Sequence, residues 1–208
     1  MKRLFIISAG AFGRELESYL EQSSEFNVEW TIAGYLHSGE NTLPDYPSDY
    51  QVVGDWTDFP FGKEDMVIVG ISDPKWKAEI FNHLHGAVEI MTFVHPSAIV
   101  GKFVSLGTGT IVCPRCILTN DVKTGVCVTI NCGSVLGHDV RVGNFSSLMA
   151  HVDIGGWGSV GESTFMGTKS TLAPHKRIGD RCKISAGAVV MRSVKNDKTM
   201  FGNPAEEF

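Results

Sequence analysis

The chain has 208 residues, 43% of them hydrophobic, and a formal net charge of −5. This length and apolar content allow one or two packed cores, and an acidic chain without long runs of Lys or Arg is not expected to bind nucleic acid or a membrane surface. No segment approaches the ~20 apolar residues that span a bilayer, and the apolar start breaks at Ser8, so we expect a strand rather than a signal peptide and a cytoplasmic protein.

Residues 1–92 are predicted to form a small Rossmann-like α/β domain. Apolar runs predict strands over 3–7, 30–36 and 66–71, and the spacing of apolar residues predicts helices over 14–21 and 74–84. The second helix is expected to be capped by Ser72 or Asp73, because either side chain can accept hydrogen bonds from the first free N–H groups.

A glycine turn is expected between the first strand and the first helix. Strand, glycine turn, helix and strand are the order of a mononucleotide-binding half of a Rossmann-type sheet, where turn amides and the helix N-terminus can receive a phosphate. The turn here is formed by Gly10, Ala11, Phe12 and Gly13. We therefore expect these four residues to bind the phosphate of a nucleotide-linked substrate.

From Val94 onward, an aliphatic residue recurs every six positions, which is neither the period of a helix nor that of an ordinary strand. The series runs without a slip through Val94, Val100, Leu106, Val112, Leu118, Thr124, Ile130, Leu136, Val142, Leu148, Ile154, Val160, Met166, Leu172, Ile178, Ile184 and Val190. Glycine often follows these residues, which suits a corner where φ is positive or where a side chain would clash. Residues 93–208 are therefore predicted to form a β-solenoid of triangular, 18-residue coils with the six-spaced residues inside.

The five cysteines are an odd number without secretory context, so reduced thiols are expected. Cys113 and Cys116 have the CxxC spacing of some zinc and redox sites, but there is no second CxxC. Cys116 and Cys182 occupy inward positions of the repeat, which favours a packing role.

His138 is the candidate general base. It lies two positions after the inward Leu136, so its side chain should point outward, and Asp139 follows it directly. A carboxylate that orients an imidazole and stabilises its protonated form is the arrangement of a general base. Gly156 lies 18 residues further on, one coil above His138, and its exposed amide could donate to an oxygen on which negative charge develops.

The order of parts resembles one family of sugar acyltransferases. An α/β domain, the linker 95–98 and hexapeptide repeats that contain Gly137-His138-Asp139 are similar to the sialic acid O-acetyltransferase and bacillosamine N-acetyltransferase family. The resemblance implies that the β-helix is left-handed. It also implies that the first domain binds a nucleotide sugar, and that acetyl-CoA binds between neighbouring subunits of a homotrimer with interfacial active sites.

The resemblance further implies roles for individual residues. Gly156 matches the position that binds the acetyl carbonyl, Ala186 one whose backbone contacts the pantetheine, and Asn131 a polar position near the site. Ser147 stands where relatives often have a second histidine.

The expected reaction is direct acetyl transfer from acetyl-CoA to a nucleotide-linked amino sugar, such as a 4-amino-4,6-dideoxy hexose for a surface glycan, without a metal. O-acetylation of sialic acid or a related sugar is the alternative. A zinc enzyme of the γ-type carbonic anhydrase class is less consistent with the sequence, because His138, His151 and His175 lack the close histidine pair of that class. A non-catalytic hexapeptide scaffold is the remaining alternative.

Overall fold

A computed structural model of the chain describes residues 1–39 and 43–208. The chain divides into two compact units, of which the first comprises residues 1–72 and 79–91 and the second residues 73–78 and 92–208. The expected division near residue 92 therefore differs from these units in one respect, because residues 73–78 group with the repeat region.

The first unit contains a parallel sheet that, within the described residues, has five strands in the order β3-β2-β1-β4-β5. Its elements are β1 (Lys2–Ile7), α1 (Ala11–Leu20), β2 (Trp30–Leu36), the 3₁₀ helix η1 (Leu43–Asp45), β3 (Val52–Gly54), β4 (Asp65–Val69) and β5 (Glu89–Ile90). The helix α2 (Pro74–Leu84) is divided between the two units. The core forms where residues 4–7 of β1 meet Leu16 and Leu20 of α1, and all of these residues are buried. No helix in the described part of the chain is long and apolar enough to cross a bilayer.

The predicted strand over 30–36 and the predicted helix over 74–84 are confirmed. Asp73 caps α2, because its Oδ1 accepts hydrogen bonds from the N–H groups of Lys75 and Trp76 at 2.9 and 3.2 Å. The predicted turn over 10–13 is wrong in part. Gly10 is the N-cap of α1 and the helix starts at Ala11, because the chain already turns at Ser8, whose φ is 85°.

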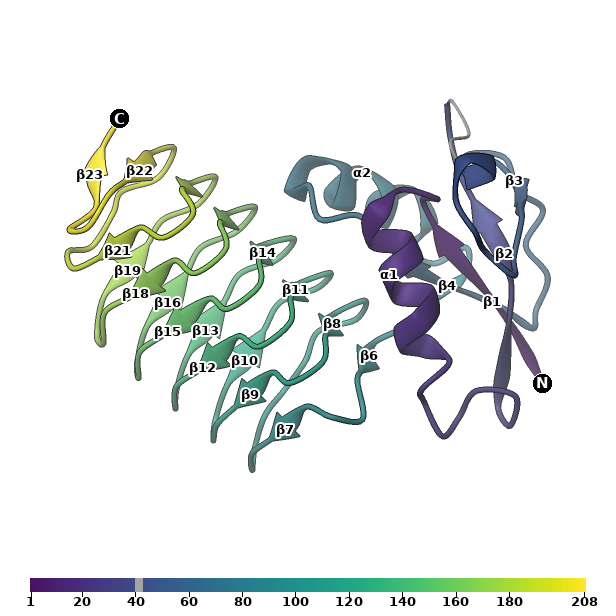
Figure 1. Cartoon of the computed structure of the whole chain (residues 1–208), viewed down its shortest axis with the longest axis horizontal. Coiled ribbons are helices and arrows are strands. Elements are labelled where there is room, and N and C mark those ends of the chain that lie inside the picture. Colours follow the sequence, from purple (N-terminus) through teal and green to yellow (C-terminus); the bar gives the residue numbers. More distant parts are fainter. Residues whose placement is uncertain (40–42) are drawn as a thin grey trace. The chain divides into compact units, whose positions relative to one another are not determined.

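The second unit is a parallel β-helix built from two-residue strands (Figure 1). These are β6 (Phe93–Val94), β7 (Ile99–Val100), β8 (Ile111–Val112), β9 (Ile117–Leu118), β10 (Lys123–Thr124), β11 (Thr129–Ile130), β12 (Val135–Leu136), β13 (Arg141–Val142), β14 (Ser147–Leu148), β15 (Asp153–Ile154), β16 (Ser159–Val160), β17 (Phe165–Met166), β18 (Thr171–Leu172), β19 (Arg177–Ile178), β20 (Lys183–Ile184) and β21 (Val189–Val190). Each strand ends on a residue of the predicted six-residue series. Strand pairs such as Leu136 with Ile154 are 18 residues apart, so the predicted coil length is confirmed.

The glycines that follow the inward residues are needed for close approach and not for a positive φ. A Cβ at Gly137 would lie 2.7 Å from the backbone N of Gly156 in the next coil, and Gly137 is not among the residues with positive φ. The left-handed positions fall two residues later, on non-glycine residues such as Asp139, with φ 63°. Of the two reasons expected for these glycines, the steric one therefore holds.

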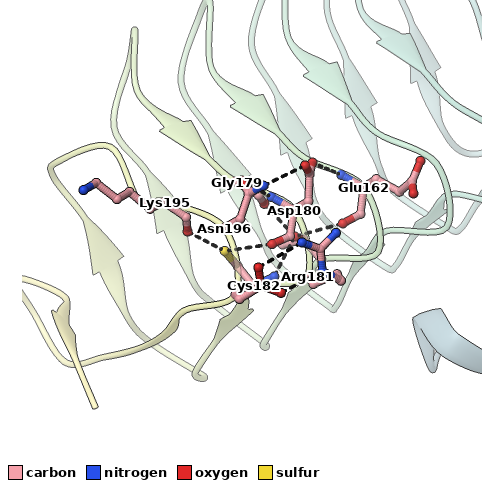
Figure 2. Close-up of polar contacts among 9 residues, drawn as sticks. Glu162, Gly179, Asp180, Arg181, Cys182, Lys195 and Asn196 are labelled. Atoms are coloured by element: carbon pink, nitrogen blue, oxygen red, sulfur yellow. Dashed lines mark hydrogen bonds and ion pairs between the residues drawn. The ribbon is translucent and has the colours of Figure 1, made fainter.

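One corner of the β-helix carries a ladder of polar side chains near the C-terminal end (Figure 2). Asp180 Oδ1 accepts a hydrogen bond from the Glu162 N–H at 2.9 Å, and Asn196 Oδ1 accepts one from the Asp180 N–H at 3.0 Å. Asn196 follows Asp180 by 16 residues instead of 18, so the last coil is shorter. The strands β22 (Thr199–Phe201) and β23 (Glu206–Glu207) close this end as an antiparallel pair.

Lys77 is a buried lysine in the part of α2 that groups with the β-helix, and its described hydrogen bonds include none to a carboxylate. Its Nζ donates to the carbonyl of Ser146 at 2.9 Å and to Thr129 Oγ1 at 3.3 Å, and the residue is 1% exposed. Burial lowers the pKa of Lys77 to about 7, although the nearby Cys127 and Asp73 act in the opposite direction. An amine held by neutral acceptors in a dry site has little to compensate its charge.

This lysine should make stability depend on pH. The folded chain releases the Lys77 proton near pH 7, whereas the unfolded chain retains it up to about the ordinary pKa of 10.5, so the unfolded state binds more protons between these values. The free energy of unfolding is therefore expected to rise with pH by up to about 1.4 kcal/mol per unit. Urea titrations at pH 7.5 and 8.5 should show this slope in the wild type and not in Lys77→Met. The exposed Lys75 on the same helix gives a matched control, Lys75→Met, and an equal slope in both variants would contradict the prediction.

Candidate active site

His138 and Asp139 form the turn after β12, at a corner of the β-helix. The imidazole Nδ1 lies 3.0 Å from Asp139 Oδ2, and the two side chains are 51% and 35% exposed. Since an ionised carboxylate can only accept a hydrogen bond, Nδ1 carries a hydrogen and its N–H donates a hydrogen bond to Asp139. The other ring nitrogen, Nε2, then has a lone pair that can accept a proton.

Gly156 lies directly against this second nitrogen. A Cβ added at Gly156 would lie 2.6 Å from His138 Nε2, so only glycine leaves room for the ring. Within the described part of the chain, the Gly156 N–H donates to no acceptor. An imidazole with an available lone pair and an uncommitted amide donor therefore lie side by side, which is the pairing that acyl transfer needs.

Two aromatic residues that were not assigned to this corner from the sequence complete it. Trp157 contacts the His138 ring edge to face, with 4.3 Å between ring centroids and an interplanar angle of 88°. His175 stacks on Trp157 at 4.7 Å and 14°. Trp157 and His175 follow Asp139 by 18 and 36 residues, so the same coil arithmetic that identified Gly156 could have found them.

The structure does not bring every predicted site residue to this corner. Asn131 follows β11 and Ala186 follows β20, two strands of one sheet, whereas His138 follows β12 in another. Asn131 is buried, with its Oδ1 accepting a hydrogen bond from the Cys132 N–H at 2.6 Å, and Ala186 is exposed. Ser147 is buried in β14. Within one chain, Asn131 and Ala186 thus share a corner that differs from that of His138.

The predicted phosphate-binding residues lie at the carboxyl end of β1. The N-cap residue Gly10 has no side-chain cap, so the first N–H groups of α1 are not occupied by one. Nearby, the Ala9 N–H donates a hydrogen bond at 3.3 Å to Nδ1 of His37, the residue that follows β2. Asp55 follows β3, and hydrogen bonding from the Thr57 backbone N–H is the main cause that lowers the pKa of this carboxyl group, with a smaller electrostatic contribution from His37. Ligands of open α/β sheets bind at this end of the strands.

Among the described residues, no three His, Cys, Asp or Glu side chains converge as metal ligands. His138 and His175 flank Trp157, and His151 follows a strand of another sheet. Cys116 and Cys182 are buried, as their inward positions predicted.

The repeat and its corner residues define the class of protein as a hexapeptide-repeat protein with an attached α/β domain. No protein-family model matches the chain. Solved structures match it over its full length. The acetyltransferase domain of PglB from Neisseria gonorrhoeae FA1090 is 19% identical with a TM-score of 0.89 and 100% coverage of both chains. PerB from Caulobacter crescentus, in complex with CoA and GDP-perosamine, is 25% identical with a TM-score of 0.85, covering 100% of this chain and 98% of PerB.

Curated relatives match a smaller part. The chain is 26% identical over 121 residues to serine acetyltransferase 2 of Arabidopsis thaliana and 31% identical over 120 residues to probable serine acetyltransferase 1 of Oryza sativa subsp. japonica. Both alignments cover 54% of this chain, which spans 31% and 32% of the relatives. These matches confirm the resemblance to hexapeptide-repeat acetyltransferases, the left-handed β-helix and the preceding α/β domain. The full-length matches cover both the α/β domain and the β-helix.

Proposed function

We propose that this protein is an acetyl-CoA-dependent N-acetyltransferase of a nucleotide-linked amino sugar, with His138 as general base. The observation that carries the proposal is the placement of His138 Nε2 against Gly156, with Nδ1 held by Asp139. The full-length similarity to PerB, which was solved with CoA and GDP-perosamine, supports the substrate class. Since acetyl-CoA and nucleotide sugars are cytoplasmic metabolites, we expect the reaction there.

The proposed reaction is a direct transfer. The sugar amine attacks the thioester carbon of acetyl-CoA while His138 Nε2 accepts a proton from the amine. The Gly156 N–H donates to the carbonyl oxygen as negative charge develops on it. Collapse of the tetrahedral intermediate forms the amide, breaks the C–S bond and releases coenzyme A, whose sulfur takes the proton from the imidazolium. Asp139 stabilises that imidazolium, and no step requires a metal.

The nucleotide of the acceptor is assigned to the first unit. The N-terminus of α1, formed by Gly10, Ala11, Phe12 and Gly13, has amide donors suited to a phosphate. His37 and Asp55 lie at the same edge of the sheet and supply an imidazole and a carboxylate. These features support binding of the acceptor through its nucleotide diphosphate group.

We also propose a homotrimer with shared active sites, and the separation of the predicted residues within one chain supports shared sites. Asn131 and Ala186 lie at a different corner from His138. One chain would not complete a site that contains all three residues. If a second copy supplies Ala186 for the pantetheine and Asn131 near the acceptor, each acetyl-CoA lies between two subunits.

Coenzyme A release from acetyl-CoA tests the function directly. UDP-, dTDP- and GDP-linked amino sugars should be assayed together with sialic acid, and the product should be treated with hydroxylamine, which cleaves esters and leaves amides intact. We expect release with at least one amino sugar and a hydroxylamine-resistant product. An inert panel, or transfer only to a hydroxyl group, would contradict the proposal.

Subunit complementation tests the shared site. His138→Ala and Ala186→Trp should each be inactive alone, because the first lacks the base and the second blocks the proposed pantetheine position. Co-expressed chains form mixed oligomers, some of whose sites combine an intact His138 with an intact Ala186. We expect measurable activity from the mixture and a trimer mass by light scattering, whereas an inactive mixture or a monomer would contradict a shared site.

A further inference from the structure

Trp157 is placed at the candidate base by the geometry of the coil itself. It lies one coil above Asp139 and one below His175, and all three residues have a left-handed backbone, with φ of 63°, 54° and 58° along the column. The Trp157 N–H donates to the carbonyl of His138 at 2.9 Å. The backbone that carries the indole is therefore tied to the residue that carries the imidazole.

The His138 ring needs more than Asp139 to hold its direction. Both side chains of that pair are partly exposed, and exposed ion pairs contribute little because solvent competes for them. One hydrogen bond at Nδ1 also leaves the ring free to swing about that point. The indole of Trp157, with its centroid 4.3 Å from that of the imidazole, supplies a second contact along the side of the ring.

Trp157 is in turn held in place by His175. The indole is 54% exposed, so little of its position is set by the interior of the β-helix. The parallel stacking of His175 at 4.7 Å covers one of its surfaces, and the His175 N–H donates to the carbonyl of Gly156 at 3.0 Å. The row His138, Trp157 and His175 thus connects the base to a support two coils away from Asp139.

We propose that Trp157 is a positioning residue for His138, holding the imidazole so that Nε2 stays against Gly156, and that His175 fixes the indole in that role. The inference rests on the proposed acetyl transfer. It assigns Trp157 an effect on the chemical step and not on the affinity for either substrate, because the contact shown is with the base. An aromatic ring is required, since edge-to-face contacts depend on the charge distribution of the ring as well as on its size.

Steady-state kinetics of Trp157→Leu and Trp157→Phe test the assignment. Leucine keeps apolar bulk without a ring, so we expect kcat to fall about 3- to 10-fold at unchanged KM for acetyl-CoA and acceptor, as the loss of one aromatic pair predicts. Phenylalanine should restore most of kcat. Phe103 offers a matched control, because it is an exposed aromatic residue of the same column with φ 61°, two coils below Asp139. Phe103→Leu should leave kcat unchanged.

Crystal structures of the wild type and of Trp157→Leu provide a readout that needs no acceptor. We expect one ordered His138 rotamer in the wild type and more than one in the variant, so the inference can be judged even if the panel of sugars proves inert. A single unchanged rotamer in Trp157→Leu would overturn it. So would an increase in acceptor KM at constant kcat, which would make Trp157 a substrate contact instead.

Discussion

Replacing His138 with alanine is expected to lower kcat by ~10²- to 10⁴-fold, the usual contribution of a positioned general base. The loss follows from the absence of Nε2 as proton acceptor, because Nδ1 is already hydrogen-bonded to Asp139 at 3.0 Å. KM for acetyl-CoA should change little, because the imidazole acts on the acceptor. Stopped-flow or end-point measurement of coenzyme A release gives kcat, and circular dichroism checks that the β-helix remains folded.

Two further variants separate the roles within the pair. Asp139→Asn retains an oxygen that can accept from Nδ1–H but loses the charge that stabilises the imidazolium, so its loss of kcat should be smaller than that of His138→Ala. His85→Ala removes an exposed imidazole from the first unit and should leave kcat unchanged. If His138→Ala retained wild-type activity, the base would have to be another residue and the proposed mechanism would fail.

The size of the loss also separates the two acceptor chemistries. An amine can reach the thioester already deprotonated when the pH is high, whereas a hydroxyl group cannot. The loss in His138→Ala should therefore shrink with rising pH for an amino sugar and remain large for a hydroxyl acceptor.

Gly156→Ala is expected to lower kcat by a factor on the order of 10², because the added methyl group displaces the reacting groups. The added Cβ would lie 2.6 Å from His138 Nε2 and 2.9 Å from its Cε1, so the ring must move away. The backbone of Gly156 lies outside the left-handed region, so alanine fits its dihedral angles and the methyl group itself is the cause. Kinetics with the acceptor identified by the panel measure the effect.

The His138→Ala background provides the control for this prediction. In the wild type, the new methyl group should displace the half-exposed ring from Trp157 and lower the free energy of unfolding by about 0.5–1.5 kcal/mol, the usual contribution of one aromatic pair. In His138→Ala there is no ring to meet, so Gly156→Ala should be nearly neutral there. Urea titrations of the four proteins give the coupling between the two sites. Equal losses in both backgrounds would mean that the glycine is required for another reason.

The sequence alone determined the β-helix in detail, because each hexapeptide is the same local unit and contacts its neighbours at a fixed offset. The two-residue strands end on the predicted series, and the offset of 18 places Gly156 at His138 before any coordinates are known. In the first unit, strongly apolar segments such as Trp30–Leu36 were also predictable. The short strands β3 and β5 were not, because they are defined by pairing at the sheet edge and not by their own composition.

Only the tertiary structure decided the directions and surroundings of individual side chains. Lys77 resembles any helix lysine in the sequence, and its burial depends on the packing of α2 residues 73–78 with the coils. The 18-residue repeat places Trp157 one coil above Asp139. That its ring contacts His138 and stacks on His175 depends on the side-chain rotamers, which the sequence does not give. A repeat fixes where each Cα lies, whereas the contacts made by an exposed side chain depend on which residues the adjacent coils place beside it.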